Sequence, residues 1–462
     1  MVKGLQMERV TKIACIGAGY VGGPTMAKIA QKCPEITVTV VDISEKRIKA
    51  WNSNDLPIYE PGLKEVILEV RDKNLFFSTD IEKAVKEAEM IFVAVNTPTK
   101  EYGEGAGEAT DMKYWMETAK SICKYSCNSN DKIIVEKSTV PVGTAEMFNE
   151  VLRRHNKHFP VLSNPEFRAE GTAMEDLENP DRILIGGDHW NDKAANLLKD
   201  IYAHWVPEER ILMTNIWSAE LSKLAANAFL AQRVSSINSL AAICEKTGGD
   251  ICEVSSCIGS DRRIGDKFLK AGPGFGGSCF KKDILNLIYI CRSLGLHQEA
   301  EYWMSVIRMN EWQVKRIINR IYDIMQRSIN GRKIAILGYS FKADTGDTRE
   351  TPSRKIIAEL LNERAIVSVS DPMSNQSACF DFGDEVTVYE SEYDAVKDAE
   401  AIIVMTDWSK YKNLNWMKIY SLMSDSKMLF DCRNFLDHQY LANVGFEVYP
   451  VGLTRVFEEI PF

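Results

Sequence analysis

The sequence lacks any long apolar run. No stretch of its 462 residues is long and apolar enough to span a bilayer, and the most apolar long helical segment is interrupted by Lys223 and Arg233. Residues 1–11 are polar and charged, without the apolar core of a secretory signal. These absences exclude a membrane-spanning protein, and we expect a cytoplasmic one.

Net positive charge and metal-binding cysteine patterns are also missing. The net charge of −9 argues against a general nucleic-acid binder. Eleven cysteines without a secretory signal indicate reduced thiols rather than a disulfide framework. The pairs Cys123/Cys127 and Cys252/Cys257 are loosely spaced and lack histidine partners, so we expect no metal. A phosphorylated ligand must therefore be held by a local basic cluster.

A dinucleotide fingerprint lies near the start of the chain. A short apolar strand, 12–16, leads into Gly17, Gly19 and Gly22, spaced Gly-x-Gly-x-x-Gly, and a helical pattern follows. The first glycine makes a tight turn, the second admits the pyrophosphate, and the third lets helix pack on strand. The pyrophosphate would then lie at the helix N-terminus.

The acid after the second strand indicates which dinucleotide is bound. Asp42 ends that strand and is placed to bind the adenosine ribose hydroxyls. No basic residue directly follows it, and Arg47 lies a turn into the next helix. The pattern therefore favours NAD over NADP.

A second glycine-rich loop, 274–279, ends at Cys279 where a helical pattern begins. A thiol near a helix N-terminus feels the positive end of the helix dipole, and Lys281 and Lys282 follow it. Both effects favour the thiolate, the nucleophilic form of cysteine. Asp283 would lie one turn along the same face. The loop therefore predicts a nucleophilic thiol beside a carboxylate.

Strands and helices alternate through the first half of the chain. Strand patterns recur at 12–16, 36–41, 90–95, 132–136 and 182–185, which predicts a parallel, doubly wound α/β sheet. The loops 96–99 and 137–141 directly follow strands and are candidates to line the cofactor crevice. A proline that merely ends an element explains either loop equally well.

The middle of the chain predicts one long helix, 217–244, that connects domains and offers a surface to a second subunit. Lys223 and Asn227 are four residues apart on it and share a face. A lysine on its own is more often a surface residue, but the amide on an otherwise apolar turn favours a buried, oriented amine.

The last third repeats the opening order of strand, glycine, helix, strand and aspartate, without the full fingerprint. We expect a second Rossmann-like half that does not bind a second NAD. Lys342, Arg349 and Arg433 are candidate phosphate or carboxylate partners, although each alone also fits solvated surface charge. The predicted domains are 1–215 for NAD, 216–330 for the central helices and 331–462 for the nucleotide sugar.

Longer segments carry a family resemblance. They are VNTPT at 95–99, EKSTVPV at 136–142, SNPEF at 163–167, ELSKLAANAFLAQR at 220–233 and GFGGSCF at 274–280. With them the chain resembles the UDP-glucose 6-dehydrogenases, the animal enzymes in particular, from about Thr11 to Gly452.

The resemblance implies a four-electron oxidation of the C6 alcohol of UDP-glucose to a carboxylate, with two NAD reduced per turnover. Asp283 and Lys223 would draw off the hydroxyl proton through a water. Cys279 would add to the aldehyde and pass through a thiohemiacetal to a thioester. Glu166 would serve as base or water-positioner in hydrolysis, and Lys223 with Asn227 would stabilise the oxyanions. Thr139 joins the catalytic set.

Binding roles follow from the same resemblance. The implied cofactor residues are Gly17, Gly19, Tyr20, Val21, Gly22, Asp42, Arg47, Val95, Thr97, Ser138, Thr139, Glu170, Lys282 and Arg349. The implied substrate residues are Glu166, Phe167, Arg168, Lys223, Asn227, Arg263, Phe268, Lys270, Phe275, Gly276, Phe280, Phe341, Lys342 and Arg433. Arg263 matches a residue donated across a subunit interface. The implied assembly is a homo-oligomer of dimers formed across the central helix, a hexamer.

Two other functions stay open. A dehydrogenase for GDP-mannose or a UDP-amino sugar would share the cysteine and the lysine. A binding protein that senses NAD or a UDP-sugar would not need them, so the intact Cys279, Lys223 and Asp283 argue against it. Tyr393 and Lys397 form a Tyr-x-x-x-Lys pair typical of epimerases, but it lies far from the fingerprint and we interpret it as chance.

Overall fold

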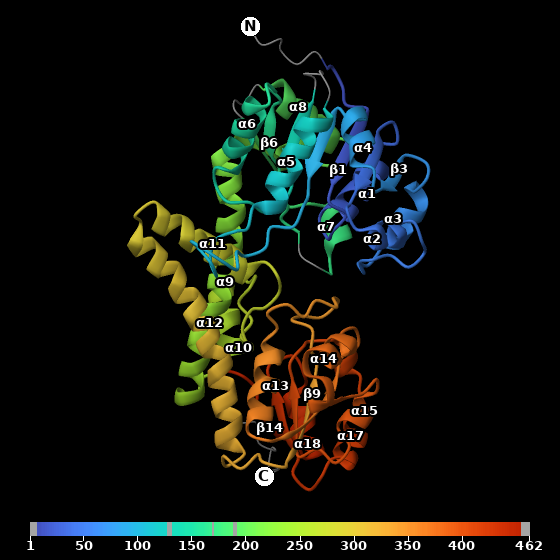
Figure 1. Ribbon diagram of the computed structural model, residues 1–462. Helices are drawn as coiled ribbons and strands as arrows, with labels where there is room; N and C mark the ends of the chain where they lie inside the picture. Colours follow the sequence, from blue (N-terminus) through green and yellow to red (C-terminus); the bar gives the residue numbers. More distant parts are fainter. Residues whose placement is uncertain (1–6, 127–131, 169–170, 188–191, 454–462) are drawn as a thin grey trace. The chain divides into compact units, whose positions relative to one another are not determined.

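The computed structural model describes residues 7–126, 132–168, 171–187 and 192–453. The chain divides into two compact units, one of Met1–Ala226 with Leu285–His297 and the other of Asn227–Ile284 with Gln298–Phe462. Each unit is built on its own sheet (Figure 1). The division into three domains stays a prediction.

The first unit contains an eight-stranded sheet in the order β3-β2-β1-β4-β5-β6-β7-β8. All neighbouring strands pair in parallel except β6 and β7, which are antiparallel. The strands are β1 (Lys12–Ile16), β2 (Thr37–Val41), β3 (Leu75–Ser78), β4 (Met90–Val93), β5 (Ile133–Glu136), β6 (Val161–Ser163), β7 (Ile183–Gly187) and β8 (Ile211–Asn215). Its fingerprint strand β1 lies inside the sheet, so the loop after it opens at the central edge.

Helices cover both faces of this sheet. Ile13 and Cys15 pack in one hydrophobic cluster and Ala14 and Ile16 in another, because successive side chains of a strand point to opposite faces. Buried residues of α1, α3 and α8 complete the first cluster, and those of α4, α5 and α6 the second. The helices are α1 (Gly22–Lys32), α2 (Glu45–Trp51), α3 (Leu63–Val70), α4 (Ile81–Glu87), α5 (Lys113–Tyr125), α6 (Thr144–Arg154), α7 (Ala173–Glu178) and α8 (Lys193–Tyr202), with the short η1 (Glu208–Arg210).

The second unit contains a six-stranded, all-parallel sheet in the order β11-β10-β9-β12-β13-β14. Its strands are β9 (Lys333–Leu337), β10 (Ile366–Ser370), β11 (Val386–Val388), β12 (Ala401–Val404), β13 (Met428–Asp431) and β14 (Glu447–Val448). Around them lie α13 (Pro352–Asn362), α14 (Asn375–Phe382), η2 (Gly383–Glu385), α15 (Glu392–Ala395), α16 (Ser409–Lys412), α17 (Trp416–Leu422) and α18 (His438–Val444).

Four helices form the middle of the chain: α9 (Ile216–Thr247), α10 (Ile251–Gly259), α11 (Phe280–Ser293) and α12 (His297–Ile324). The helix α9 begins in the first unit and continues into the second. It is free of glycine and proline, which explains its length. Among the described residues, no helix has the length and apolarity needed to cross a membrane.

The predicted fold class is confirmed: two parallel-sheet, Rossmann-like units accompany a long helix that exceeds the expected 217–244 by a few residues. The expected parallel sheet has one exception, the antiparallel β6–β7 pair, which a strand pattern cannot reveal because it carries no direction. Strands β3, β6, β8, β11 and β14 were not anticipated.

Candidate active site

The glycines of the fingerprint have different surroundings. Gly17 has a φ of +109°, and a Cβ there would lie 2.4 Å from the carbonyl oxygen of Ala94. A Cβ on Gly22 would lie 2.0 Å from the Gly17 carbonyl oxygen, so strand and helix pack too closely for a side chain. A Cβ on Gly19 would meet nothing within 4 Å. The first and third glycines are therefore required by the protein itself, whereas Gly19 faces open space.

The start of α1 fits a pyrophosphate. Its N-cap residue, Val21, makes no side-chain cap, and the first turn contains no acidic residue. The positive end of the helix dipole therefore remains uncompensated by the protein's own side chains and would favour an anion. Tyr20, beside this turn, is 40% exposed.

Asp42 lies where the sequence placed it, at the end of β2. Its Oδ2 accepts a hydrogen bond from the Ala18 N–H, and its Oδ1 accepts one from the Ser44 N–H, each at 2.9 Å. The guanidinium of Arg47 also bonds Oδ2 at 2.9 Å. Arg47 thus pairs with the acid expected to bind a ribose, so the two predicted cofactor residues are brought together.

The loops after β4 and β5 are tied to each other. Thr97 Oγ1 donates to the Thr139 carbonyl oxygen at 2.8 Å, and Ser138 Oγ donates to the Val95 carbonyl oxygen at 2.7 Å. Four predicted residues therefore form one surface at the carboxyl edge of the sheet. The predicted cofactor residue Glu170 lies outside the described residues.

Glu166 lies among cations. Its Oε2 is 3.3 Å from the Nζ of Lys137 and 3.9 Å from the Nε of Arg168, and it accepts a bond from Thr25 Oγ1 at 3.3 Å. Burial alone would raise the pKa of Glu166, but Lys137, Arg168 and Lys223 outweigh it and hold the pKa at about 2. Glu166 is therefore a carboxylate at neutral pH.

Phe167 lies between two further cations of the first unit. The guanidinium of Arg182 is 4.0 Å from the centre of its ring, and the Nζ of Lys223 is 5.5 Å from it. Lys223 is 7% exposed, which agrees with the buried amine expected from its apolar turn. Sequence reasoning found Phe167 and Lys223 but not Arg182.

In the second unit, Cys279 is exposed and directly precedes α11. The Asp283 N–H donates to the Cys279 carbonyl oxygen at 2.9 Å, so the two residues span the first helical turn. Asp283 is 1% exposed; its Oδ2 accepts a bond from Asn227 Nδ2 at 2.5 Å, and its Oδ1 is 2.7 Å from Lys282 Nζ. Cys279 and Asp283 are therefore one helical turn apart, as expected, and Asn227 orients the carboxylate.

Three amide side chains hold the backbone of the thiol loop. Asn310 accepts from the Phe275 N–H at 2.8 Å and donates to its carbonyl oxygen at 3.0 Å. Asn238 accepts from the Gly272 N–H, and Gln313 donates to its carbonyl oxygen. These bonds replace the strand or helix pairing that the loop lacks.

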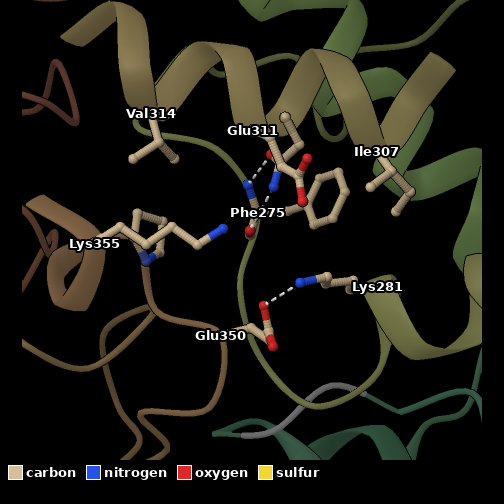
Figure 2. A pocket seen from close by; sticks show the side chains of 9 residues that line it. Phe275, Lys281, Ile307, Glu311, Val314, Glu350 and Lys355 are labelled. Atoms are coloured by element: carbon tan, nitrogen blue, oxygen red, sulfur yellow. Dashed lines mark hydrogen bonds and ion pairs between the residues drawn. The ribbon is translucent and has the colours of Figure 1, made fainter. Parts of the chain in front are cut away.

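The cavity beside this loop is small. Figure 2 shows Lys281 reaching Glu350, and the Lys281 Nζ lies 3.0 Å from the Glu350 Oε2. Its lining is Phe275, Lys281, Ile307, Asn310, Glu311, Val314, Glu350, Pro352 and Lys355. A volume of about 10 Å³ holds at most one water, so this cavity does not take a nucleotide sugar.

Several of the remaining predicted substrate residues lie near the thiol loop, 274–279. A Cβ on Gly276 would lie 2.9 Å from Cβ of Phe341, and the Gly277 N–H donates to the Arg349 carbonyl oxygen at 2.8 Å. The Arg433 Nη2 donates to the Phe341 carbonyl oxygen at 2.5 Å, and Lys342 Nζ is 5.6 Å from the Phe341 ring.

The aromatic candidates form a second group, in which Phe280 lies 5.8 Å from Phe275 and 6.2 Å from Phe268 between ring centres. The arginine candidates are engaged locally: Arg263 pairs with Asp261 and Arg349 with Asp347. Lys270 is exposed, and its predicted role rests on the sequence.

Besides Arg182, sequence reasoning missed the roles of Lys137 and of three amides. Lys137 was noticed only within a loop and a family segment, and its burial depends on residues of distant elements. Asn238, Asn310 and Gln313 are single amides on long helices, where nothing in the sequence separates them from surface residues. The available signals for Lys137 were its place directly after the strand at 133–136 and its presence in the segment EKSTVPV.

Comparison with known proteins agrees with this architecture. Sequence models of the UDP-glucose/GDP-mannose dehydrogenase family match the chain in three parts: the NAD binding domain at residues 11–206, the central domain at 217–312 and the UDP binding domain at 335–438.

Individual relatives agree as well. The chain is 53% identical to UDP-glucose 6-dehydrogenase 2 of Arabidopsis thaliana, with 96% of this chain and 97% of that protein covered. It is 52% identical, with the same coverage, to UDP-glucose 6-dehydrogenase 3 of Oryza sativa subsp. japonica. These relatives are from plants, so the narrower resemblance to animal enzymes stays a prediction.

Solved structures give the same result. A UDP-glucose dehydrogenase from the archaeon Pyrobaculum islandicum is 30% identical, with a TM-score of 0.84 over 97% of this chain and 99% of that one. A UDP-D-ManNAc dehydrogenase from Pyrococcus horikoshii is 26% identical, with a TM-score of 0.81 over 96% and 100%. The chain therefore belongs to the UDP-glucose/GDP-mannose dehydrogenase family, and it is a dehydrogenase whose cofactor is NAD.

Proposed function

We propose that this protein oxidises C6 of UDP-glucose from alcohol to carboxylate, forming UDP-glucuronate. The observation that carries the proposal is Cys279, an exposed thiol at the start of α11 with the carboxylate of Asp283 one turn away. A dehydrogenase that stops at an aldehyde needs no nucleophile. A thiol in this place supports oxidation beyond it.

NAD supplies the oxidising chemistry by accepting one hydride in each of two oxidations. Gly19 and the uncapped N-terminus of α1 would hold its pyrophosphate, and Asp42 its adenosine ribose. Tyr20, Val95, Thr97 and Ser138 would line the rest of the site.

In the first oxidation the C6 alcohol loses a hydride and its hydroxyl proton, and the C=O bond of the aldehyde forms. Asp283 and Lys223 would remove the proton through a water. Asn227 fixes the Asp283 carboxylate for this task by its 2.5 Å hydrogen bond.

In the second oxidation the sulfur of Cys279 adds to the aldehyde carbon, and the oxygen takes up a proton to give a thiohemiacetal. Loss of a hydride and of that proton gives a thioester. Lys223 and Asn227 would stabilise the negative charge on oxygen as the adduct forms. The thiol is needed because hydride leaves a tetrahedral adduct more readily than a free aldehyde.

Hydrolysis ends the cycle: water adds to the acyl carbon, the carbon–sulfur bond breaks, and the thiolate and the carboxylate are released with two protons. The low pKa of Glu166, about 2, makes it a weak base at neutral pH. It would therefore orient the water rather than ionise it, with Thr139 as a second polar contact.

The UDP moiety would bind the second unit through Phe341, Lys342 and Arg433, with Phe268, Lys270, Phe275 and Phe280 nearby. A cytosolic homo-oligomer of dimers across α9, a hexamer, belongs to the same proposal. The exposed apolar side chains on α9, Trp217, Leu221, Phe229 and Ile243, between 44% and 59% exposed, support such an interface. Light scattering on the purified protein measures the assembly directly.

The proposal predicts a stoichiometry of two NADH for each UDP-glucose consumed, with no free aldehyde. Absorbance of NADH against product counted by chromatography measures it. Cys279→Ser should bind both ligands and lose continuous turnover, because a serine hydroxyl is far harder to ionise than a thiol. One NADH per sugar, trapped aldehyde, or a faster reaction with GDP-mannose or a UDP-amino sugar would overturn the assignment.

A further inference from the structure

Lys137, which the proposed steps do not use, lies at the centre of a buried polar network. Its side chain is 2% exposed. Its Nζ donates to Asn164 Oδ1 at 3.1 Å and lies 3.4 Å from Tyr202 Oη and 3.3 Å from Glu166 Oε2. Tyr202 Oη donates to the same Asn164 oxygen at 2.6 Å. One ammonium thus meets an amide, a phenol and a carboxylate.

The network is fixed by four elements of the first unit. Lys137 follows β5, Asn164 follows β6, and Tyr202 ends α8. Asn164 Nδ2 donates to the Leu184 carbonyl oxygen in β7 at 2.8 Å, which turns its Oδ1 towards the ammonium. A buried ammonium is tolerated only where such partners satisfy it, so Lys137 has little freedom to move away from Glu166.

Other charged groups also face Glu166. Arg168 lies 3.9 Å away on the same segment, and Lys223 contributes from α9. Tyr202 of α8 is the further titratable group, and Thr25 of α1 gives a hydroxyl contact at 3.3 Å. Lys137 lies closer to Glu166 than Arg168 does, and it is also bonded to Asn164 and Tyr202.

We propose that Lys137 is a positioning residue for the reaction: it holds Glu166 ionised and oriented so that this carboxylate aligns the water that hydrolyses the thioester. Asn164 and Tyr202 hold the ammonium in place. The inference rests on the proposed function, because it concerns the last step of that reaction. No bond to Lys137 forms or breaks.

Lys137→Met tests the inference, since methionine keeps the length of the side chain and removes its charge. Loss of an adjacent opposite charge should move the acid limb of the kcat–pH profile upward by about one to three pH units. At pH 7, kcat should fall at least about tenfold, KM for UDP-glucose should change less than about threefold, and intact mass should show an acyl adduct on the protein. Hydride transfer precedes the affected step, so one rapid burst of two NADH should remain.

Lys28→Met is the matched control. Lys28 is equally buried, 5% exposed, on the same unit, and it pairs with Glu178 rather than Glu166. Its substitution should cause a similar loss of stability without a shift in the pH profile or an adduct. The same profile shift in both variants would show a merely structural effect and overturn the inference.

Tyr202→Phe decides the question if Lys137→Met does not fold. It removes one hydroxyl and should shift the acid limb in the same direction by a smaller amount, with partial adduct accumulation. An unchanged profile in a folded, NAD-binding variant would overturn the inference. Absence of NADH formation from UDP-glucose by the native protein would instead refute the proposed function itself.

Discussion

In the first unit β1 is followed by Gly17 and β2 by Asp42; in the second unit β9 is followed by Gly338 and β10 by Asp371. Both glycines have positive φ, +109° and +102°, and both N–H groups donate to the last residue of the neighbouring strand. Their strands occupy equivalent places in the order of each sheet. The two halves thus share one backbone plan.

The two aspartates are used differently. Asp371 is 2% exposed, and its oxygens accept bonds from the backbone N–H groups of Tyr339, Ser340, Met373 and Ser374, and from the indole of Trp408. Asp42 accepts two backbone bonds, and its third partner, Arg47, has a half-exposed side chain. A carboxylate saturated by its own fold cannot bind a ribose, whereas one paired with a movable arginine can.

The two units also differ in the length of the segment that joins the glycine after the first strand to the next helix. In the first unit α1 begins at Gly22, shortly after Gly17, whereas in the second α13 begins only at Pro352, well after Gly338. The long connection instead carries Phe341 and Arg349, which contact the thiol loop. Where the first unit has the short fingerprint turn, the second unit therefore has residues that contact the thiol loop.

The largest expected effect is on stability. Asp371→Ala should leave several buried donors without an acceptor and destabilise the second unit by about 3–5 kcal/mol. Asp42→Ala should lower the free energy of unfolding by less, about 1–2 kcal/mol, because it leaves only the N–H groups of Ala18 and Ser44 without their acceptor. Urea unfolding followed by circular dichroism compares the two. Equal losses would contradict the distinction between a structural and a ligand-binding aspartate.

The next largest effects should differ between two glycines of one loop, Gly17 and Gly19. Gly17→Ala should destabilise the first unit by about 2 kcal/mol or more, because its positive φ and the nearby Ala94 carbonyl oppose a side chain. Gly19→Ala should fold normally and weaken NAD binding at least about tenfold, since its Cβ would occupy ligand space. Thermal unfolding and NAD titration by fluorescence measure both. Normal NAD binding by Gly19→Ala would show that this space is not the pyrophosphate site.

Asp42 and Asp371 occupy the same place in the sequence pattern, so the pattern alone could not predict that they differ in their contacts. The order of strand, glycine and helix predicted both Rossmann-like units, because the periodicity of strands and helices is visible in neighbouring residues. The saturation of Asp371 depends on Trp408, which is distant in the chain, and the burial of Lys137 depends on Asn164 and Tyr202. Strands β11 and β14 span three and two residues, too short for any periodicity to appear. Local signals thus predicted the elements, and tertiary contacts decided the use of each residue.

A smaller effect concerns the choice of cofactor. Asp42 should repel a 2′-phosphate and accept from a 2′-hydroxyl, so Asp42→Ala should lower the ratio of kcat/KM for NAD over NADP by about tenfold. Arg47, released from its partner, would then favour the phosphate. Steady-state kinetics with both cofactors measures the ratio, and Asp371→Asn serves as the control that should leave it unchanged. Equal use of NAD and NADP by the native protein would contradict the role of Asp42.

The smallest expected effect is on the pH dependence of stability. It concerns the carboxyl residues at the ends of the equivalent strands β5 and β13. Asp431, the last residue of β13, accepts from the Phe435 and Leu436 N–H groups and from His438. At the end of β5, Glu136 is 1% exposed, and burial, followed by the charge of Glu220, raises its pKa well above 4.5.

A carboxyl whose pKa is higher in the folded than in the unfolded state binds its proton more tightly when folded. The stability that it contributes is therefore complete below the unfolded pKa and is lost as pH rises through the folded one. Glu136→Gln keeps the neutral shape and removes this loss, so the variant should gain stability relative to the native protein, by about 1 kcal/mol, as pH rises from 4.5 to 8. Urea unfolding across that range measures the difference, with the exposed Glu117→Gln as control. A difference that is flat or falls with pH would mean that Glu136 is ionised in the folded protein.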